Sequence, residues 1–207
     1  MVESRVPLQL TEKPMKLLAV IPARGNSTRV PGKNKMKFGG VPCVVKAIQA
    51  VQESSYQITI AVVSNDPEIR ALAAKNGALA LRESEIVAKG DLYDVLYFAL
   101  QKVDGPWEAI LLAYPNVPIR PAGLFDRLID TYLSGDLLSV NARCQERSAS
   151  GGSVFSPDYL NRVFVDRGNR DFQRATFLDY NQDELLEIDT TEDVHWANTL
   201  FSAGAVQ

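Results

Sequence analysis

The chain has 207 residues, of which 46% are hydrophobic and 23% charged, a composition typical of a soluble globular protein of about one domain. Its formal net charge of −3 argues against nonspecific nucleic-acid binding, which requires a basic surface, so we expect no nucleic-acid partner. No apolar run approaches the roughly 20 residues that cross a membrane, and the N-terminus lacks the apolar core of a signal peptide, so we expect a cytoplasmic protein without membrane contact.

Residues 1–15 are mostly polar and contain two prolines, and we interpret them as a loose lead-in to a single domain spanning residues 16–207. The apolar run at 16–23 predicts a strand, and it leads into a loop with two glycines and three cations, Arg24, Arg29 and Lys33. Glycines let backbone N–H groups approach an anion, and the cations neutralise it, so the loop predicts a nucleoside triphosphate site. It differs from the P-loop of kinases and ATPases because Lys33 is followed by Asn34 instead of Ser or Thr.

Short apolar segments then alternate with segments of helical periodicity. The pattern predicts helices over 43–52, 67–76, 92–102, 124–133 and 191–201, and strands over 57–64, 78–82, 108–113, 137–142 and 153–156. Apolar strands separated by helices are typical of a mostly parallel sheet with helices on both faces, so we expect a single-domain α/β fold. Ligands of such sheets bind beyond the carboxyl ends of the strands, where the cationic loop also begins.

Polar residues stand where several predicted strands end. Ser64 and Asp66 follow the second strand, Arg82 ends the third, and Asp91 precedes a helix. Helix capping is the simplest interpretation of Asp66 and Asp91. For Arg82 the residues alone leave two interpretations open, a ligand-binding cation or a solvated charge at the edge of the sheet.

Two acidic residues near the C-terminus, Glu187 and Asp189, alternate on a segment that we expect to be extended, so their carboxylates face the same way. Two convergent carboxylates beside a triphosphate suit Mg²⁺, whose remaining ligands are phosphate oxygens and waters. The alternative interpretation is an acidic helix N-terminus, which explains Glu192 and Asp193. We expect Thr191 and Asp193 to cap that helix.

The two cysteines, Cys43 and Cys144, lie in no metal-ligand spacing, and we interpret them as free, buried thiols. His195 is the only histidine and stands beside Trp196 in a helical pattern, which favours packing or solvent contact over catalysis. We therefore expect neither a zinc site nor a histidine-dependent hydrolase.

Two motifs of the opening loop, Ile-Pro-Ala-Arg-Gly-x-Ser at 21–27 and Pro-Gly-Lys-Asn at 31–34, resemble the sugar-acid cytidylyltransferases, above all the acylneuraminate branch. The resemblance covers about residues 16–120 and resumes near residue 186. It implies a Rossmann-like fold of the nucleotide-diphospho-sugar transferase type, Mg²⁺ as cofactor, and a homodimer. It also implies the reaction, which is transfer of CMP from CTP to the anomeric hydroxyl of a 2-keto sugar acid with release of pyrophosphate.

The resemblance assigns roles to individual residues. Those expected to bind the nucleotide are Ala23, Arg24, Gly25, Asn26, Ser27, Lys33, Asn34, Ser64 and Arg82. Arg24 and Lys33 are also expected to be catalytic because they hold phosphate charge. Asp189 and Glu187 are the expected metal ligands.

The chain departs from the family in its acceptor half. The pattern Leu-Gln-Pro-Thr-Ser-Pro-Leu-Arg is replaced by Ala-Tyr-Pro-Asn-Val-Pro-Ile-Arg at 113–120, so the glutamine is missing. We assign Asn116, the polar group best placed to substitute, and Arg120 to the acceptor. The segment 139–185 is shorter than in the family, and its candidates for holding a carboxylate are Arg143, Arg147, Arg162, Arg167, Arg170 and Arg174.

These departures leave alternatives to the transferase open. One is a nucleotide-binding homologue that has lost transferase activity, and another is a nucleotidyltransferase with a different nucleotide or acceptor. A third is an unrelated phosphatase or glycosyltransferase built on a similar sheet.

Overall fold

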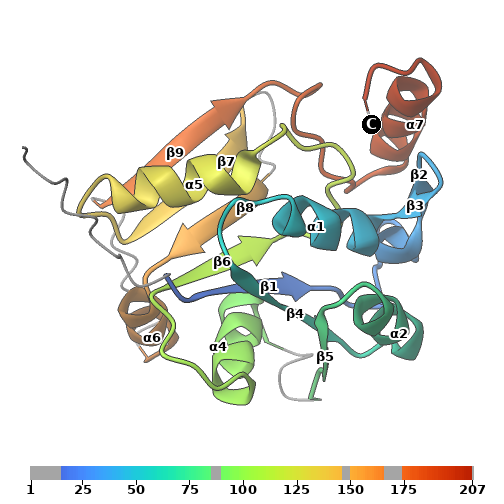
Figure 1. The fold of residues 1–207 in the computed structure, drawn as a ribbon. Helices are drawn as coiled ribbons and strands as arrows, with labels where there is room; N and C mark the ends of the chain where they lie inside the picture. The colour runs from blue at the N-terminus through green and yellow to red at the C-terminus, as the bar shows by residue number, and fades with distance from the viewer. Residues whose placement is uncertain (1–14, 85–89, 146–149, 166–173, 207) are drawn as a thin grey trace, which may run out of the picture.

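The computed structural model describes residues 15–84, 90–145, 150–165 and 174–206. Seven strands form one sheet in the order β5-β4-β1-β6-β8-β7-β9, and two short strands form a separate hairpin (Figure 1). The strands are β1 (Leu17–Pro22), β2 (Lys37–Phe38), β3 (Val41–Pro42), β4 (Ile58–Ser64), β5 (Leu79–Arg82), β6 (Ala109–Ala113), β7 (Ser139–Cys144), β8 (Ser150–Phe155) and β9 (Ala175–Tyr180). The helices are the 3-10 helix η1 (Lys33–Lys35) and the α-helices α1 (Cys43–Gln52), α2 (Pro67–Lys75), α4 (Leu92–Lys102), α5 (Leu124–Leu133), α6 (Pro157–Val165) and α7 (Thr191–Ser202).

Among the described strands of the large sheet, β8 is the one that runs against its neighbours. It pairs antiparallel with β6 and β7, whereas β1 pairs parallel with β4 and β6, β4 with β5, and β7 with β9. The prediction of a mostly parallel sheet in a single α/β domain is therefore confirmed.

Both faces of the sheet are covered by helices, which explains why the central strands are apolar along their whole length. In β1, Leu17 and Ile21 pack into the core under α1, α2 and α5, while Leu18 and Val20 pack into the core under α4 and α6. All four side chains are almost completely buried. Figure 1 shows α1, α2 and α5 on one side of the sheet and α4 and α6 on the other.

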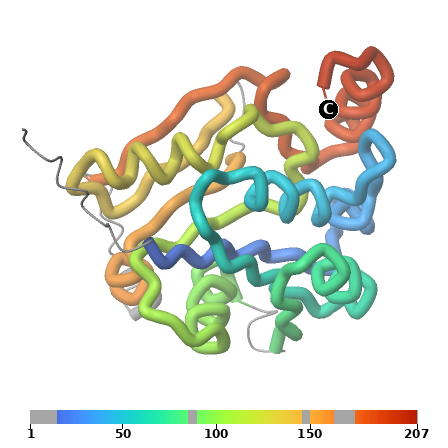
Figure 2. The backbone as a smooth tube through the Cα atoms, viewed as in Figure 1, coloured from blue at the N-terminus to red at the C-terminus, as the bar shows by residue number. Residues whose placement is uncertain are grey.

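A third cluster of buried side chains joins the two ends of the chain. It contains Val30 and Phe38 from the segment after β1 and Ile188 from the segment before α7. The rings of Phe38 and Phe201 lie 6.1 Å apart, and Figure 2 shows α7 beside the β2–β3 hairpin. This packing brings the acidic C-terminal segment next to the cationic loop, although the two are far apart in sequence.

The structure also contains elements that the sequence pattern did not predict. These are η1, α6, β9 and the β2–β3 hairpin. The missed strand β9 lies at the edge of the sheet, where half-exposed side chains replace the continuous apolar run of a central strand. Residues 1–14, which hold most of the expected lead-in, lie outside the described residues.

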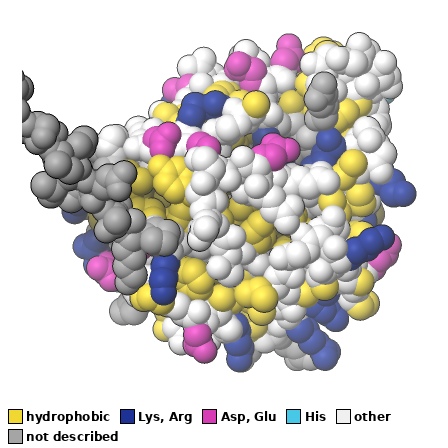
Figure 3. Space-filling model, viewed as in Figure 1, with side chains coloured by type: hydrophobic (Ala, Val, Ile, Leu, Met, Phe, Trp, Pro, Cys, Tyr) yellow, Lys and Arg dark blue, Asp and Glu magenta, His cyan; other side chains and the backbone are white. Residues whose placement is uncertain are grey.

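The surface carries charges of both signs, and the cysteines have the character predicted for them. On the face seen in Figure 3, basic and acidic side chains are interspersed, consistent with the small net charge of −3. Cys43 and Cys144 are both buried and free. No helix in the described ranges is long and apolar enough to cross a bilayer.

Candidate functional site

A cleft lies beyond the carboxyl end of β1, where parallel sheets bind their ligands. Its volume is about 330 Å³, between the loop after β1, the start of α4 and the segment after β6. The loop residues that line it are Pro22, Arg24, Asn26, Ser27, Thr28, Arg29, Val30, Lys33 and Asn34. The remaining lining residues are Gly90, Asp91, Leu92, Val95, Tyr114, Pro115 and Asn116. The structure thus brings most of the predicted loop residues together with Asn116.

Arg24 ties the base of this loop to the neighbouring elements. Its Nε donates to the Oε1 of Glu83 at 2.9 Å, and its Nη2 donates to the carbonyl of Gly90 at 3.1 Å. Glu83 directly follows β5 and is buried, while the Arg24 side chain is 39% exposed. The guanidinium is therefore fixed at the cleft wall while part of its donor surface still faces solvent.

Gly25 and Asn34 shape the backbone of the loop. The Gly25 N–H donates to Asn65 Oδ1 at 2.8 Å, and a Cβ at Gly25 would lie only 2.8 Å from the Cβ of Asp66. Asn34, the middle residue of η1, donates from Nδ2 to the carbonyl of Arg24 at 2.8 Å. The Asn34 side chain is buried, and no described residue donates to its Oδ1. A buried acceptor without a partner is costly, so it favours a ligand that brings a donor.

Lys33 connects the loop to the C-terminal acidic segment. Its Nζ donates to Asp189 Oδ1 at 2.7 Å and to the carbonyl of Ile188 at 2.9 Å. Arg29 forms an ion pair with the other oxygen of Asp189 at 3.2 Å. Two of the three predicted phosphate-binding cations therefore share Asp189 as their counterion.

Glu187 lies deeper than Asp189 and is held by two donors. Asn116 Nδ2 donates to its Oε1 at 3.0 Å, and the Ser150 N–H donates to its Oε2 at 3.2 Å. Burial raises the pKa of Glu187; the hydrogen bond from Asn116 opposes this, and the negative charge of Asp189 adds to it. Burial and the nearby Glu187 charge raise the pKa of Tyr114 to about 12, so its phenol is neutral at physiological pH.

The two carboxylates have the donor chemistry that Mg²⁺ prefers, since they offer hard oxygens. Within the described ranges no group of three or more His, Cys, Asp or Glu side chains surrounds a common point. A cation here would therefore take most of its ligands from phosphate oxygens and water. All four carboxylate oxygens of Glu187 and Asp189 accept hydrogen bonds or ion pairs, so a cation would have to compete with donors such as Lys33 and Arg29.

Several predicted site residues do not line the cleft. Ala23 is buried in the core, and Ser64 is buried with its Oγ accepting from the N–H of Asp66. Arg82 ends the edge strand β5 with an exposed side chain, and its neighbour Glu83 makes the contact to the loop instead. The nucleotide-binding roles of these residues remain predictions.

Arg120 lies in a second cavity instead of the cleft. Its guanidinium donates to the carbonyls of Tyr114 and Val117, so it holds the segment after β6 in place. Through this segment it positions Tyr114 and Asn116, two residues that line the cleft.

The arginines proposed for the carboxylate of the acceptor are dispersed. Arg143 pairs with Asp179, and Arg174 pairs with Asp136. Arg162 is exposed on α6. The other three candidates, Arg147, Arg167 and Arg170, lie outside the described residues.

The predicted helix caps are confirmed with one correction. Asp66 accepts from the N–H groups of Glu68 and Ile69, and Asp91 forms a capping box with Asp94. For α7 the expectation of Thr191 is wrong, because the cap is Thr190, whose Oγ1 accepts from the N–H of Asp193.

The corrected cap of α7 and the role of Glu83 differ in whether the sequence carried a signal for them. Asp193 completes the capping box by accepting from the N–H of Thr190, as its expected capping role requires. The spacing Thr-x-x-Asp at 190–193 was the available signal for the correct cap. Glu83 carried no comparable signal, because its burial depends on tertiary packing.

The sequence and the fold both match known cytidylyltransferases. A family model described as cytidylyltransferase matches residues 18–204. The CMP-N,N'-diacetyllegionaminic acid synthase of Legionella pneumophila is 34% identical over 114 residues, which are 51% of this chain and 48% of that protein. The pseudaminic acid cytidylyltransferase of Campylobacter jejuni is 42% identical over 66 residues, 32% of this chain and 28% of that protein. The matches thus span about half or less of the length of these curated relatives.

Solved structures show the same fold at low sequence identity. A CMP:2-keto-3-deoxy-manno-octonic acid synthetase complexed with CTP superposes with a TM-score of 0.71 at 14% identity, covering 91% of this chain and 99% of that chain. A cytidylyltransferase from Leptospira borgpetersenii gives a TM-score of 0.69 at 20% identity, covering 91% and 87%. Because the family model covers almost the whole chain, this protein belongs to the cytidylyltransferase family.

Proposed function

We propose that the protein transfers CMP from CTP to the anomeric hydroxyl of a 2-keto sugar acid of the acylneuraminate type and releases pyrophosphate. The observation that supports this most directly is the cleft after β1, which gathers Arg24, Arg29 and Lys33 on one loop. Three cations on a glycine-containing loop at the carboxyl end of a strand suit a triphosphate. The relatives named for legionaminic and pseudaminic acids support an acidic sugar as the acceptor.

On the nucleotide side, Lys33 and Arg29 exchange one anionic partner for another. In this structure both contact Asp189, and a triphosphate entering the cleft offers them phosphate oxygens in its place. Arg24 stays anchored by Glu83 and presents its remaining donor surface. The acceptor hydroxyl loses its proton to water as its oxygen forms a bond to the α-phosphorus, the bond from that phosphorus to the bridging oxygen breaks, and pyrophosphate leaves. Fixed cations around this centre stabilise the charge that develops in the transition state.

On the acceptor side, Tyr114 and Asn116 line the same cleft. Tyr114 occupies the position of the glutamine in the resembled family, and its neutral phenol offers both a donor and an acceptor to a sugar hydroxyl. Asn116 is fixed by its hydrogen bonds to Glu187 and to the carbonyl of Ile188. This fixed geometry suits orientation of an acceptor, which contributes to rate by positioning.

We propose Asp189 and Glu187 as the residues that hold Mg²⁺ when the nucleotide is bound. Mg²⁺ supplies charge neutralisation at the phosphate oxygens. The displacement of Lys33 and Arg29 from Asp189 by the triphosphate would leave that carboxylate available for the cation. Glu187 contributes from a half-buried position and also accepts the hydrogen bond that holds Asn116.

The direct experiment measures pyrophosphate release with each of the four nucleoside triphosphates and a panel of eight-carbon and nine-carbon 2-keto sugar acids. We expect release with CTP and one class of acid, and its loss when EDTA replaces Mg²⁺. Activity with another nucleoside triphosphate would contradict the assignment of CTP. Undiminished release in EDTA would contradict the metal proposal while leaving the transferase intact.

The second candidate is a nucleotide-binding homologue without transferase activity. The observation that favours it is Tyr114 in place of the family's glutamine at the cleft wall. Calorimetry of the folded protein with CTP tests this candidate. Binding of CTP, together with no release of pyrophosphate with any acid of the panel, would favour it.

A further inference from the structure

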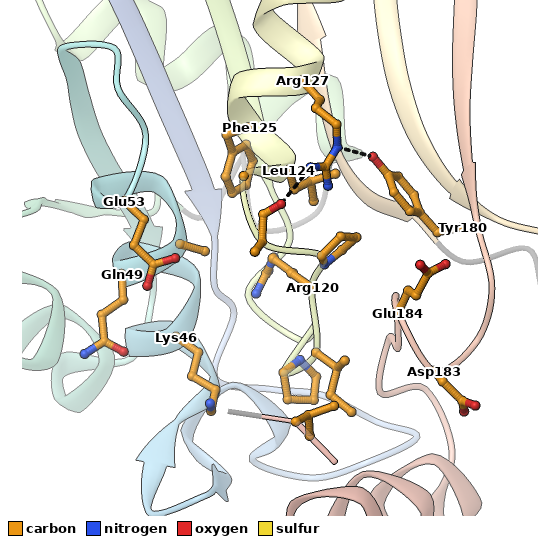
Figure 4. Close-up of a pocket in the computed structure, with 17 residues that line it drawn as sticks. Lys46, Gln49, Glu53, Arg120, Leu124, Phe125, Arg127, Tyr180, Asp183 and Glu184 are labelled. Carbon is orange, nitrogen blue, oxygen red and sulfur yellow. Dashed lines mark hydrogen bonds between the residues drawn. The ribbon is translucent and has the colours of Figure 1, made fainter. Parts of the chain in front are cut away.

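A second and larger cavity, of about 780 Å³, lies beside α1 and α5. It is bounded by α1, by the loop that leads into α5, and by the segment that follows β9 (Figure 4). Among the described residues, none that lines this cavity also lines the cleft after β1. The cytidylyl transfer proposed above therefore makes no use of it.

Besides the exposed Arg127, which donates to the Tyr180 hydroxyl and to the carbonyl of Ala122, two cations in this cavity lack a carboxylate partner. They are Lys46 of α1 and Arg120 of the loop before α5, and both side chains are half-buried. No acidic residue in the described part of the chain forms an ion pair with either one. By contrast, Arg24, Arg143 and Arg174 each pair with a carboxylate. A desolvated cation without a counterion is unfavourable, so this cavity favours an anionic occupant.

The environment of each cation supports this conclusion. Arg120 donates to the carbonyls of Tyr114 and Val117, but its Nε is buried and no described residue accepts from it. Burial lowers the pKa of Arg120 to about 10. Burial also lowers the pKa of Lys46, and the positive charge of Arg120 contributes in the same direction. Both cations line the same cavity, so one anionic group there can serve as counterion to both.

Acidic and hydrogen-bonding side chains form the outer part of the cavity. Figure 4 shows Gln49 and Glu53 along α1 on one side, Asp183 and Glu184 on the other, and Arg120 between them. Glu53, Asp183 and Glu184 are exposed to solvent. Their charges disfavour a polyanion such as a triphosphate, whereas their oxygens can accept hydrogen bonds from hydroxyl groups.

We propose that this cavity binds a small hydroxylated oxyanion, either a carboxylate or a phosphate monoester, at a site separate from the nucleotide cleft. Its anionic group contacts Lys46 and Arg120, and its hydroxyls contact Gln49, Glu53 and Glu184. The inference is independent of cytidylyl transfer because the two sites share no lining residue within the described ranges.

The test is a titration of the ¹⁵N-labelled full chain, followed by backbone amide shifts, with D-gluconate and with glycerol 3-phosphate as probes. We expect saturable shifts along residues 46–53 and 118–127 with at least one probe, and the probe that saturates identifies the anionic group. Saturation confined to residues 23–34 would place the anion in the nucleotide cleft and overturn the proposal. Absence of saturable shifts with both probes would overturn it as well.

Matched variants make the test specific. Lys46→Gln removes one charge-assisted contact and is expected to weaken binding about 10- to 100-fold. Lys102→Gln is the control, because each of the two lysines lies over a phenylalanine ring. Lys46 Nζ is 4.4 Å from the centre of the Phe201 ring, and Lys102 Nζ is 5.9 Å from the centre of the Phe98 ring. Equal affinities of wild type and Lys46→Gln would overturn the proposal.

A second variant has the opposite expected sign. Glu53→Gln removes an exposed negative charge at the opening and should tighten binding of either probe, without disturbing the buried face of α1. An unchanged or weaker affinity in a folded Glu53→Gln protein would contradict the assigned position of the ligand.

Discussion

At the scale of single residues, two cations of the loop share one counterion, Asp189. Lys33 has a side-chain exposure of only 16% and contacts both Asp189 and the carbonyl of Ile188. Arg29 reaches the same carboxylate with a side chain that is 70% exposed. Lys33, the less exposed of the two, is therefore the better positioned cation, since fewer rotamers are open to it.

Replacing Lys33 tests the phosphate-binding role. Lys33→Ala is expected to lower kcat/KM for pyrophosphate release about 10²- to 10³-fold, because a fixed cation at the reacting phosphates is lost. Lys37→Ala, which removes an exposed lysine from the neighbouring strand β2, is the control and should keep normal kinetics. Near-normal turnover in a folded Lys33→Ala protein would remove Lys33 from the proposed machinery.

Gly25 is required by close packing. A Cβ at this position would lie 2.8 Å from Asp66 Cβ and 2.9 Å from Asp66 Oδ2. Gly25→Ala should therefore lower the free energy of unfolding by about 1–3 kcal/mol, as overpacking does elsewhere, and displace the cap of α2. Chemical denaturation measures the effect, and Gly135→Ala, whose added Cβ has ordinary contacts, should stay near wild type. Equal losses in both variants would contradict the packing argument.

The sequence predicted residues of the loop better than residues brought from elsewhere. Arg24, Asn26, Ser27, Lys33 and Asn34 all line the cleft, because a loop of about ten residues after a buried strand has little choice of location. Ser64 and Arg82, which were predicted from the ends of other strands, do not line the cleft. Whether a residue at the end of a strand faces the cleft depends on the order of the strands and on the direction of its side chain. The local sequence pattern does not specify either of these.

At the scale of elements, α7 shows how one cap sets the position of functional groups. Thr190 and Asp193 form a reciprocal capping box, and Asp193 also accepts from the N–H of Asp189 at 2.9 Å. The cap therefore fixes both the start of the helix and the backbone at the proposed metal ligand. Asp193 is almost completely buried, so its hydrogen bonds are shielded from water.

Two neighbouring threonines distinguish the true cap from the expected one. Thr190→Ala is expected to lower the free energy of unfolding by about 1 kcal/mol, because a free N–H of the first turn loses its acceptor. Thr191→Ala should lower the free energy of unfolding much less. The one hydrogen bond described for its Oγ1 goes to the exposed Glu192 at 3.3 Å. Equal losses from the two substitutions, measured by urea denaturation, would reject Thr190 as the cap.

At the scale of the whole molecule, stability depends on contacts that join elements across the fold. Asp126 in the first turn of α5 accepts from Ser54 Oγ and from the Ser55 N–H at 3.1 Å, which fastens α5 to the end of α1. Burial alone would raise the pKa of Asp126, but these hydrogen bonds outweigh it and the pKa is lowered. The carboxylate form is thus the one that stabilises the native state.

This link predicts a pH dependence of stability. The pKa of Asp126 is lower in the folded state than in the unfolded state. The stabilisation that its carboxylate gives the folded protein is therefore fully present above the unfolded pKa of about 3.9, and it is lost as the pH falls through the folded pKa. Asp126→Asn should therefore lower the free energy of unfolding at pH 7 by about 1–3 kcal/mol, and the difference from wild type should shrink on acidification.

Denaturation at several pH values measures the difference. Asp104→Asn, at an exposed acidic residue outside the helices, is the control and should match wild type at each pH. A difference between wild type and Asp126→Asn that stays constant down to acidic pH would contradict ionisation of Asp126 as its cause.

The sequence by itself determined the alternation of strands and helices, the mostly parallel sheet and the cationic loop. These follow from local periodicity and from residues adjacent in the chain. Only the tertiary structure decided that Asp189 meets Lys33 and Arg29, that Glu83 holds Arg24, and that Arg120 lies in a second cavity. Those contacts join residues that are far apart in sequence, and strand order and the packing of α7 on the β2–β3 hairpin bring them together.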